Sequence, residues 1–124
     1  AIEGVAFGSE LILESMGSNG FFPESIVVSG GATRSEFWLQ IHSDVSNLPL
    51  TLTKNPDAPL LGCAILAAVG AGIYEDIHTA VEQMVQIDRV IEPNSQVHAE
   101  YQPFYEAYKA SYLVLRNIRY NLEN

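Results

Sequence analysis

The stretch IVVSGGATRSEFW, residues Ile26 to Trp38, decides how the rest of this chain is interpreted. It opens with three β-branched residues, and such a short apolar run predicts a fully buried strand over residues 26–29. Gly30 and Gly31 then interrupt the run. Because glycine reaches positive φ cheaply and carries no Cβ, two adjacent glycines predict a tight turn that a ligand can approach closely.

The helix that follows the glycines has its own start signal. Thr33 and Glu36 have the spacing of a capping box, in which each side chain accepts from a backbone N–H of the first turn. A strand, a glycine turn and a helix N-terminus together place free N–H groups beside an opening without a side-chain wall. That geometry suits a nucleotide. A tight β-to-α turn without any ligand fits the same residues, and the residues alone leave both interpretations open.

The composition bounds the class of protein. The chain has 124 residues, enough for one domain or part of one, and its net charge of −9 disfavours nucleic acid or an anionic membrane as a partner. The longest apolar run, residues 59–73, is shorter than the roughly 20 residues of a membrane span, and no signal peptide is visible. The single cysteine, Cys63, cannot form an internal disulfide. We therefore expect a soluble cytoplasmic protein.

Hydrophobic periodicity predicts seven elements. Helices are expected over residues 1–16, 35–46, 59–71, 77–85 and 99–122, and strands over residues 26–29 and 50–53. Pro49 precedes the second strand and costs no ladder bond if that strand lies at a sheet edge. The order of the elements predicts a helix-rich α/β fold, but a sheet of only two strands is marginally stable. With an opening at Ala1 that already has the pattern of a helix interior, this predicts a fragment whose further strands lie elsewhere.

Side-chain patterns assign faces to three of the helices. The helix over 35–46 is expected to bury Phe37, Trp38, Ile41 and Val45 and to expose Gln40, Ser43 and Asp44. Asn47 is expected to end it. The last helix carries an apolar stripe that consists mainly of aromatic residues, which we call the aromatic stripe. Such a stripe favours packing of the helix on its own domain over binding of a partner. The members of that stripe are Tyr101, Phe104, Tyr105, Tyr108, Tyr112, Leu115 and Leu122.

The helix over 59–71 is apolar all round, so it is expected to be buried on most faces. Asp57 is its expected N-cap, with Pro59 in the first turn. Small side chains share one face, where another backbone can come close: Ala64, Ala67, Ala68 and Ala71. Cys63 has no histidine near it in sequence, which favours a buried structural thiol over a nucleophile.

No complete catalytic or metal-binding set is visible. His42, His78 and His98 are too scattered for a metal site and are expected at the surface. The phosphate-loop motif is absent, and the glycine pair lacks the third glycine of the Rossmann fingerprint. The residues by themselves therefore predict at most a nucleotide cradle without a catalyst.

Several motifs, in order, resemble the FGGY family of carbohydrate kinases. SGGATRSEFW (29–38) with QIHSDV (40–45) is similar to the adenosine motif of that family. EGVAF (3–7), LPL (48–50) and LGCAILAAVGAGIY (61–74) continue the resemblance. YQPFYEAY (101–108) resembles the terminal helix, most closely that of pentulose kinases of the ribulokinase and xylulokinase type. The resemblance covers nearly the whole chain.

This resemblance implies the C-terminal part of an actin-like, ribonuclease-H-like ATPase domain, with residues 1–124 as the C-terminal portion of the second kinase domain. By analogy, Gly30, Gly31 and Ala32 lie along the adenosine moiety, and Ser35 lies near the adenine. The helix over 62–71 would pack across the interdomain hinge. Cys63 stands where the family pattern usually has alanine.

The implied function is transfer of the γ-phosphate of ATP to a sugar hydroxyl, of a pentulose or polyol, with Mg²⁺ held mainly by the rest of the enzyme. The catalytic aspartate and the sugar pocket would lie upstream, so no residue here is assigned a catalytic role and the fragment alone is expected to be inactive. Its expected partners are the sugar and ATP, within a homo-oligomer. The alternative is a non-catalytic assembly or regulatory domain of the same ancestry.

Overall fold

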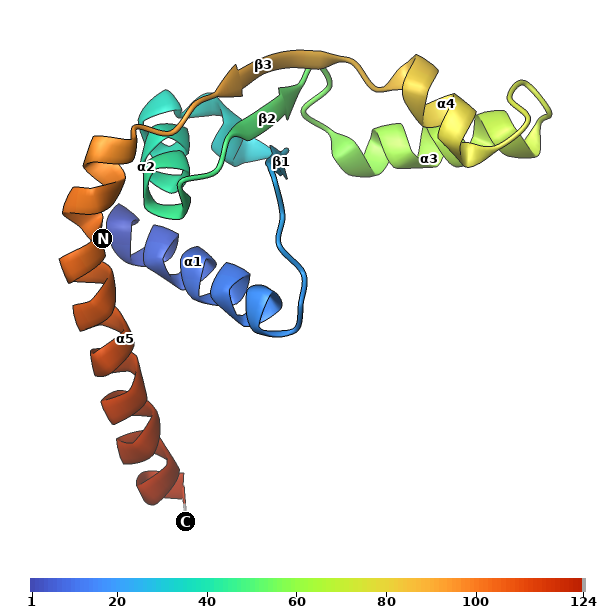
Figure 1. Ribbon diagram of the computed structural model, residues 1–124. Coiled ribbons are helices and arrows are strands. Elements are labelled where there is room, and N and C mark those ends of the chain that lie inside the picture. The colour runs from blue at the N-terminus through green and yellow to red at the C-terminus, as the bar shows by residue number, and fades with distance from the viewer. Residues whose placement is uncertain (124) are drawn as a thin grey trace.

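The computed structural model describes the backbone of residues 1–123 and the side chains of residues 1–116, so Leu122 of the expected aromatic stripe lies outside the described side chains. Five α-helices, one short 3₁₀ helix and three strands follow one another along the described chain (Figure 1). Their order is α1 (Ile2–Ser18), β1 (Ile26–Val28), η1 (Gly31–Arg34), α2 (Glu36–Ser46), β2 (Leu50–Thr53), α3 (Ala58–Gly70), α4 (Ile77–Met84), β3 (Ile87–Ile91) and α5 (Ser95–Glu123).

The sheet has the order β1-β2-β3. β1 and β2 are parallel and are joined by α2, whereas β2 and β3 are antiparallel. β2 is therefore the central strand, so the edge position that would have excused Pro49 does not apply. Pro49 is tolerated because it precedes the strand, where its carbonyl accepts a hydrogen bond from the Ile26 N–H at 3.0 Å.

The outer strands depart from the sequence expectations. β1 was expected to be fully buried, but 66% of Val27 is exposed, because its side chain lies on the sheet face opposite to Ile26 and Val28 and nothing in the described chain covers it. β3 was not predicted at all. Asp88 and Arg89 interrupt its apolar pattern, and only Ile91 of the strand is buried. A strand so exposed gives little hydrophobic signal.

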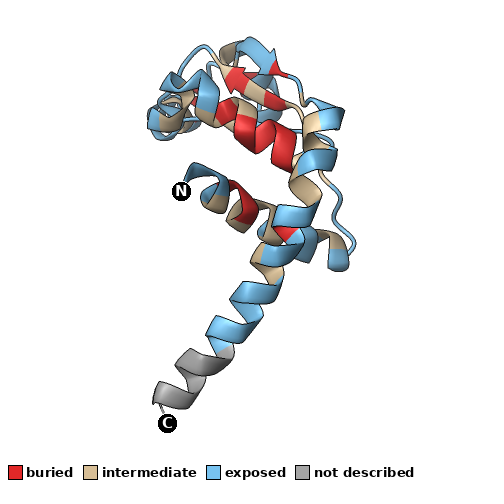
Figure 2. Ribbon diagram, turned by 90° about the vertical axis from the view of Figure 1, so that its left-hand side faces the viewer, coloured by how far each residue is buried: buried red, intermediate tan, exposed pale blue. Residues whose placement is uncertain are grey.

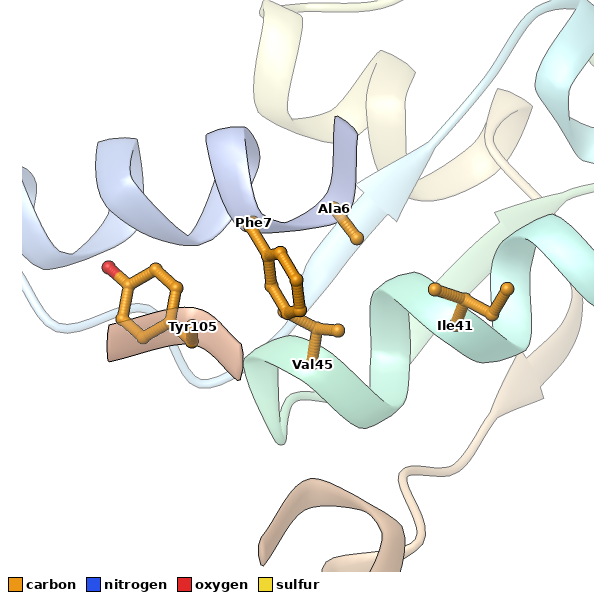
Figure 3. Packing of buried hydrophobic residues seen from close by; sticks show 5 residues of the cluster. All are labelled: Ala6, Phe7, Ile41, Val45 and Tyr105. Atoms are coloured by element: carbon orange, nitrogen blue, oxygen red, sulfur yellow. The ribbon is translucent and has the colours of Figure 1, made fainter. Parts of the chain in front are cut away.

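The main core lies between α1, α2 and α5 (Figure 3). Phe7 of α1 is at its centre, with the rings of Tyr101, Tyr105 and Tyr108 at centroid distances of 5.9, 6.0 and 5.7 Å. Such aromatic pairs add to the free energy gained by burial. The first half of α5 thus packs on its own domain, as predicted, while Phe104 on the same helix is exposed.

Buried residues concentrate on α2, which has two packed sides (Figure 2). One side carries Leu39, which packs with the strand residues Leu50, Leu52 and Ile91, and the other carries Ile41 and Val45 of the main core. Because both sides are covered, the sequence prediction of a single inward face is wrong in part. Ser43 and Asp44, expected outside, are buried, and Phe37, expected inside, is exposed.

A polar junction joins the end of α2 to the start of α5. The Asp44 carboxylate accepts from the Asn94 N–H at 2.7 Å and from the Gln40 amide at 2.8 Å. The ring of His98 lies 3.0 Å from the Asp44 carbonyl and 3.1 Å from the Val45 carbonyl. Since carbonyl oxygens only accept, the proton is on His98 Nδ1. The buried carboxylate is thus hydrogen-bonded, which offsets the free energy lost when it is removed from water.

α3 and α4 form a hairpin that projects from the sheet (Figure 1). At its base, where β2 and β3 end and begin, the Lys54 N–H donates to the Gln86 carbonyl at 2.9 Å. Only Ile65 and Ala68 of α3 are buried, and Cys63 is exposed, so the expectations of a helix covered on most faces and of a buried thiol are both wrong within this chain. Among the described residues, no helix combines the length and apolar content that a membrane crossing requires.

Candidate functional site

The turn after β1 is built on a glycine that has positive φ. Gly30 has φ 84° and ψ −162°, a backbone conformation that side-chain-bearing residues rarely adopt. Its N–H donates to the Pro56 carbonyl at 2.8 Å, which ties this turn to the loop between β2 and α3. Gly31 has an ordinary φ and begins the 3₁₀ turn η1.

The helix start after this turn differs from the expected capping box. Ser35, not Thr33, is the N-cap of α2, and its Oγ accepts from the Trp38 N–H at 3.3 Å. Thr33 instead donates from its hydroxyl to the Gly30 carbonyl at 2.7 Å. The reason is the 3₁₀ turn η1, which includes Thr33 and Arg34 and so moves the start of α2 to Ser35.

Beside the turn lies an open pocket of about 490 Å³. Its lining residues come from the ends of β1 and η1 and from the loop that leads into α3: Ser29, Gly30, Gly31, Arg34, Pro56, Asp57 and Pro59. A Cβ built on Gly31 would meet no atom within 4 Å, so the backbone here faces free space. The Asp57 carboxylate accepts from the Leu60 N–H at 3.1 Å, which confirms it as the N-cap of α3.

The structure brings together only part of the predicted nucleotide site. Gly30 and Gly31 line the pocket, whereas Ala32 and Ser35 do not. Ser35 uses a lone pair to cap α2, although its hydroxyl proton stays available for another acceptor. Nucleotide binding by these four residues stays a prediction.

Sequence reasoning missed that Arg34 and Asp57 belong to the same pocket. A signal for this existed. A strand, a helix and a second strand in succession favour a parallel pair, and the carboxyl ends of parallel strands meet at one sheet edge, where ligands bind in open α/β sheets. Recognising that unit would have placed the Gly30 turn beside the loop before α3.

The described residues do not provide a metal site. Among the side chains that the structure describes, no three from His, Cys, Asp or Glu lie close enough to hold a metal ion. Asp57 lines the pocket, but its Oδ1 already accepts the capping hydrogen bond.

His42 lies away from this pocket, and the expectation that it is a surface residue is wrong. Only 8% of it is exposed, and its ring is stacked on that of Trp38 at a centroid distance of 3.7 Å. Burial lowers the pKa of the His42 imidazole below its ordinary value, since the charged form loses its hydration. His78 is exposed, and His98 is partly buried in the polar junction.

Comparison with known proteins gives consistent matches. The family model described as the C-terminal domain of the FGGY family of carbohydrate kinases matches residues 1–71. A xylulose kinase of Staphylococcus epidermidis is 36% identical over 111 residues, which are 90% of this chain and 22% of that protein. An autoinducer-2 kinase of Escherichia coli is 38% identical over 90 residues, which are 73% of this chain and 17% of that protein. The chain thus spans about a fifth of the length of these relatives.

Solved structures of carbohydrate kinases also match this chain. A ligand-bound xylulose kinase from Lactobacillus acidophilus superposes on 93% of this chain and 23% of its own, with a TM-score of 0.84 and 27% identity. A glycerol kinase from Plasmodium falciparum with ADP has a TM-score of 0.72 over 88% of this chain and 22% of its own, and at 22% identity it shows the fold alone. The expected fold class, the C-terminal part of an actin-like, ribonuclease-H-like domain, is confirmed.

Proposed function

The chain belongs to the FGGY family of carbohydrate kinases, and on that premise we propose that it supplies the adenosine end of an ATP site. The complete kinase would transfer the γ-phosphate of ATP to a hydroxyl of a pentulose or related polyol. The relatives named xylulose kinase support this acceptor class. A cytoplasmic location and a homo-oligomeric state remain predictions.

One observation carries the proposal: the Gly30–Gly31 backbone faces an open pocket at the edge where the parallel strands β1 and β2 end. Without side chains on these residues, a nucleoside can approach the backbone closely. The adenosine would lie along Gly30, Gly31 and Ala32. Ser35 would be near the adenine, with its free hydroxyl proton directed to a ring nitrogen while its oxygen continues to cap α2.

This chain would bind and orient the nucleotide, but it would not perform the proton transfer. Phosphoryl transfer needs a positioned base for the acceptor hydroxyl, and Mg²⁺, when bound, neutralises charge on the phosphates. The described residues offer no three-ligand set for the metal, and none of their carboxylates is assigned as the base. Both would come from the remaining four fifths of the enzyme. Residues 1–124 alone should therefore show no sugar-kinase activity.

The test is the substitution Gly31→Val in a complete kinase that carries this chain. Because Gly31 has an ordinary φ and free space around its Cβ position, the variant should fold while its side chain fills the nucleotide approach. We expect the KM for ATP to rise about tenfold or more with the KM for sugar unchanged, the pattern of a lost binding interaction. Gly4→Val is the matched control, since Gly4 is equally open and lies on α1.

Equal rises in both KM values, or a fall in melting temperature absent from the control, would show a folding defect instead. An unchanged KM for ATP in a well-folded Gly31→Val enzyme would refute the nucleotide assignment. Gly30 is unsuitable for this test, because its φ of 84° would strain any other residue.

A further inference from the structure

The pocket beside the Gly30 turn contains one carboxylate and one guanidinium. Asp57 comes from the loop between β2 and α3, and Arg34 comes from the end of η1. A guanidinium has only donors, whereas a carboxylate has only acceptors. Among the lining residues, Asp57 is therefore the one charged group that can accept a hydrogen bond from a ligand.

The position of Asp57 is fixed by hydrogen bonds on its backbone and its side chain. Its N–H donates to Asn55 Oδ1 at 3.0 Å, and its Oδ1 accepts the capping bond from the Leu60 N–H at 3.1 Å. The carbonyl of the preceding residue, Pro56, accepts from the Gly30 N–H at 2.8 Å. The carboxylate therefore has a defined place relative to the glycine turn.

The second carboxylate oxygen, Asp57 Oδ2, is the strongest acceptor left in the pocket. No described residue donates to it, and Asp57 forms no ion pair with a described side chain. The Gly30 carbonyl is already engaged, because it accepts from the hydroxyl and the N–H of Thr33 at 2.7 and 3.2 Å. Since a carboxylate has about four acceptor positions, the capping bond leaves Oδ2 open to a ligand.

A carboxylate in this place selects which part of a nucleotide lies beside it. The phosphates are negatively charged and are repelled by Asp57, whereas the ribose presents uncharged hydroxyl donors. In open α/β sheets that bind dinucleotides, a carboxylate similarly accepts from a ribose hydroxyl. The sugar is thus the part of a nucleotide whose chemistry fits Asp57.

We propose that Asp57 is a specificity-determining residue, which accepts through Oδ2 from a ribose hydroxyl of the nucleotide while Oδ1 continues to cap α3. This inference rests on the proposed function, because it requires a nucleotide in the pocket. It adds a preference for nucleotides whose sugar carries these hydroxyls. It also places the sugar between the loop before α3 and the Gly30 turn, with the phosphates directed away from Asp57.

The test measures binding of ADP and of its dideoxy analogue, which lacks both ribose hydroxyls, by calorimetry in a complete kinase that carries this chain. The wild type should bind ADP about tenfold or more tightly than the analogue, because the analogue cannot donate to the charged oxygen. Asp57→Ser keeps a favoured N-cap residue and removes the second oxygen. In this variant the preference for ADP should fall to about twofold or less, through weaker binding of ADP.

A second variant protects the test against poor folding of the first. Asp57→Asn also keeps a favoured N-cap, but the second oxygen is replaced by an amide group that donates, so the preference for ADP should be lost in the same way.

Asp76→Ser is the matched control. Asp76 is the N-cap of α4, where its carboxylate accepts from the Thr79 N–H at 2.7 Å, and it is not among the residues that line the nucleotide pocket. The control should leave both dissociation constants unchanged. A purely structural role of Asp57 would weaken the binding of both nucleotides equally, so the ratio of the two constants isolates the contact with the sugar.

An unchanged ratio in well-folded Asp57 variants would overturn the proposal, and so would a wild type that binds the two nucleotides equally. The two proposals can be told apart when they fail. A raised KM for ATP in Gly31→Val with an unchanged ratio in Asp57→Ser would keep the nucleotide pocket and remove the ribose contact. An unchanged KM for ATP in Gly31→Val would remove both.

Discussion

α3 of the α3–α4 hairpin is more apolar in sequence than the helices of the α1–α2–α5 core, yet less of it is covered. Phe7 of the core is 7% exposed and surrounded by three tyrosine rings, whereas Leu66 of α3 is 60% exposed. α3 packs on α4 and buries only Ile65 and Ala68. Apolar composition therefore predicts that a helix surface is buried. The packing shows which of these surfaces are buried within the described chain.

The largest expected effect is on the core. Phe7→Ala should lower the free energy of unfolding by about 3–5 kcal/mol, because it removes a buried ring and leaves a cavity among the tyrosines. Leu66→Ala should cost less than about 0.5 kcal/mol, since that side chain is already largely in water. Urea unfolding of both variants makes the comparison. Similar losses would show that α3 is covered in solution, for example by a second copy.

The next effect concerns the polar junction that fixes α5 to α2. Asp44→Ala should cost about 2–3 kcal/mol, because it leaves the Asn94 N–H and the Gln40 amide without their charged acceptor. Asp44→Asn, the control, keeps one oxygen acceptor and should cost less. Hydrogen exchange at the start of α5 should rise in the alanine variant only. If it rises equally in both, the charge rather than the geometry holds the junction.

A smaller effect is expected inside the hairpin. Ala68→Leu should cost about 1–2 kcal/mol by overpacking, because Ala68 is one of the two buried residues of α3. Ala64→Leu lies on the same helix at an exposed position and should be nearly neutral. Thermal unfolding of the two variants compares a covered with an uncovered position on the same face of α3. A neutral Ala68→Leu would mean that α3 and α4 do not pack closely.

The smallest effect is a pH dependence that comes from His42. Burial lowers its pKa in the folded protein, so the unfolded chain binds the proton more readily. Stability should therefore be complete above the ordinary pKa of 6.5 and should fall as the pH drops below it. The difference between wild type and His42→Gln, measured by urea unfolding from pH 8 to 5, isolates this group from His98. A difference that does not change with pH would refute the assignment.

Local sequence patterns predicted the elements well. Periodicity located all five α-helices, β1 and β2, and the turn chemistry of Asn47 and Asp57 is confirmed, with Asn47 at a φ of 53°. The failures concern contacts between distant segments. Asp44 was expected outside because no local pattern reveals that α5 begins against it. β3 was missed because Asp88 and Arg89 interrupt its apolar pattern.

The candidate site was predicted only in part, again because local patterns do not reveal contacts between distant segments. The glycine pair is a local signal, and the structure places both glycines in the pocket. Arg34 and Asp57 join them only because β1 and β2 pair in parallel, which brings together residues from two loops. The capping-box prediction failed because the 3₁₀ turn η1 moves the N-cap from Thr33 to Ser35.

The base of the hairpin, where the Lys54 N–H donates to the Gln86 carbonyl, has a consequence for how the sheet tolerates change. These residues are 32 positions apart, so pairing β2 with β3 closes a long loop. The entropy of loop closure grows only with the logarithm of length, and each doubling of the loop costs about 0.6 kcal/mol. The number of residues in the turn between α3 and α4 is therefore a weak constraint on the pairing of β2 with β3, as long as the two helices keep their packing.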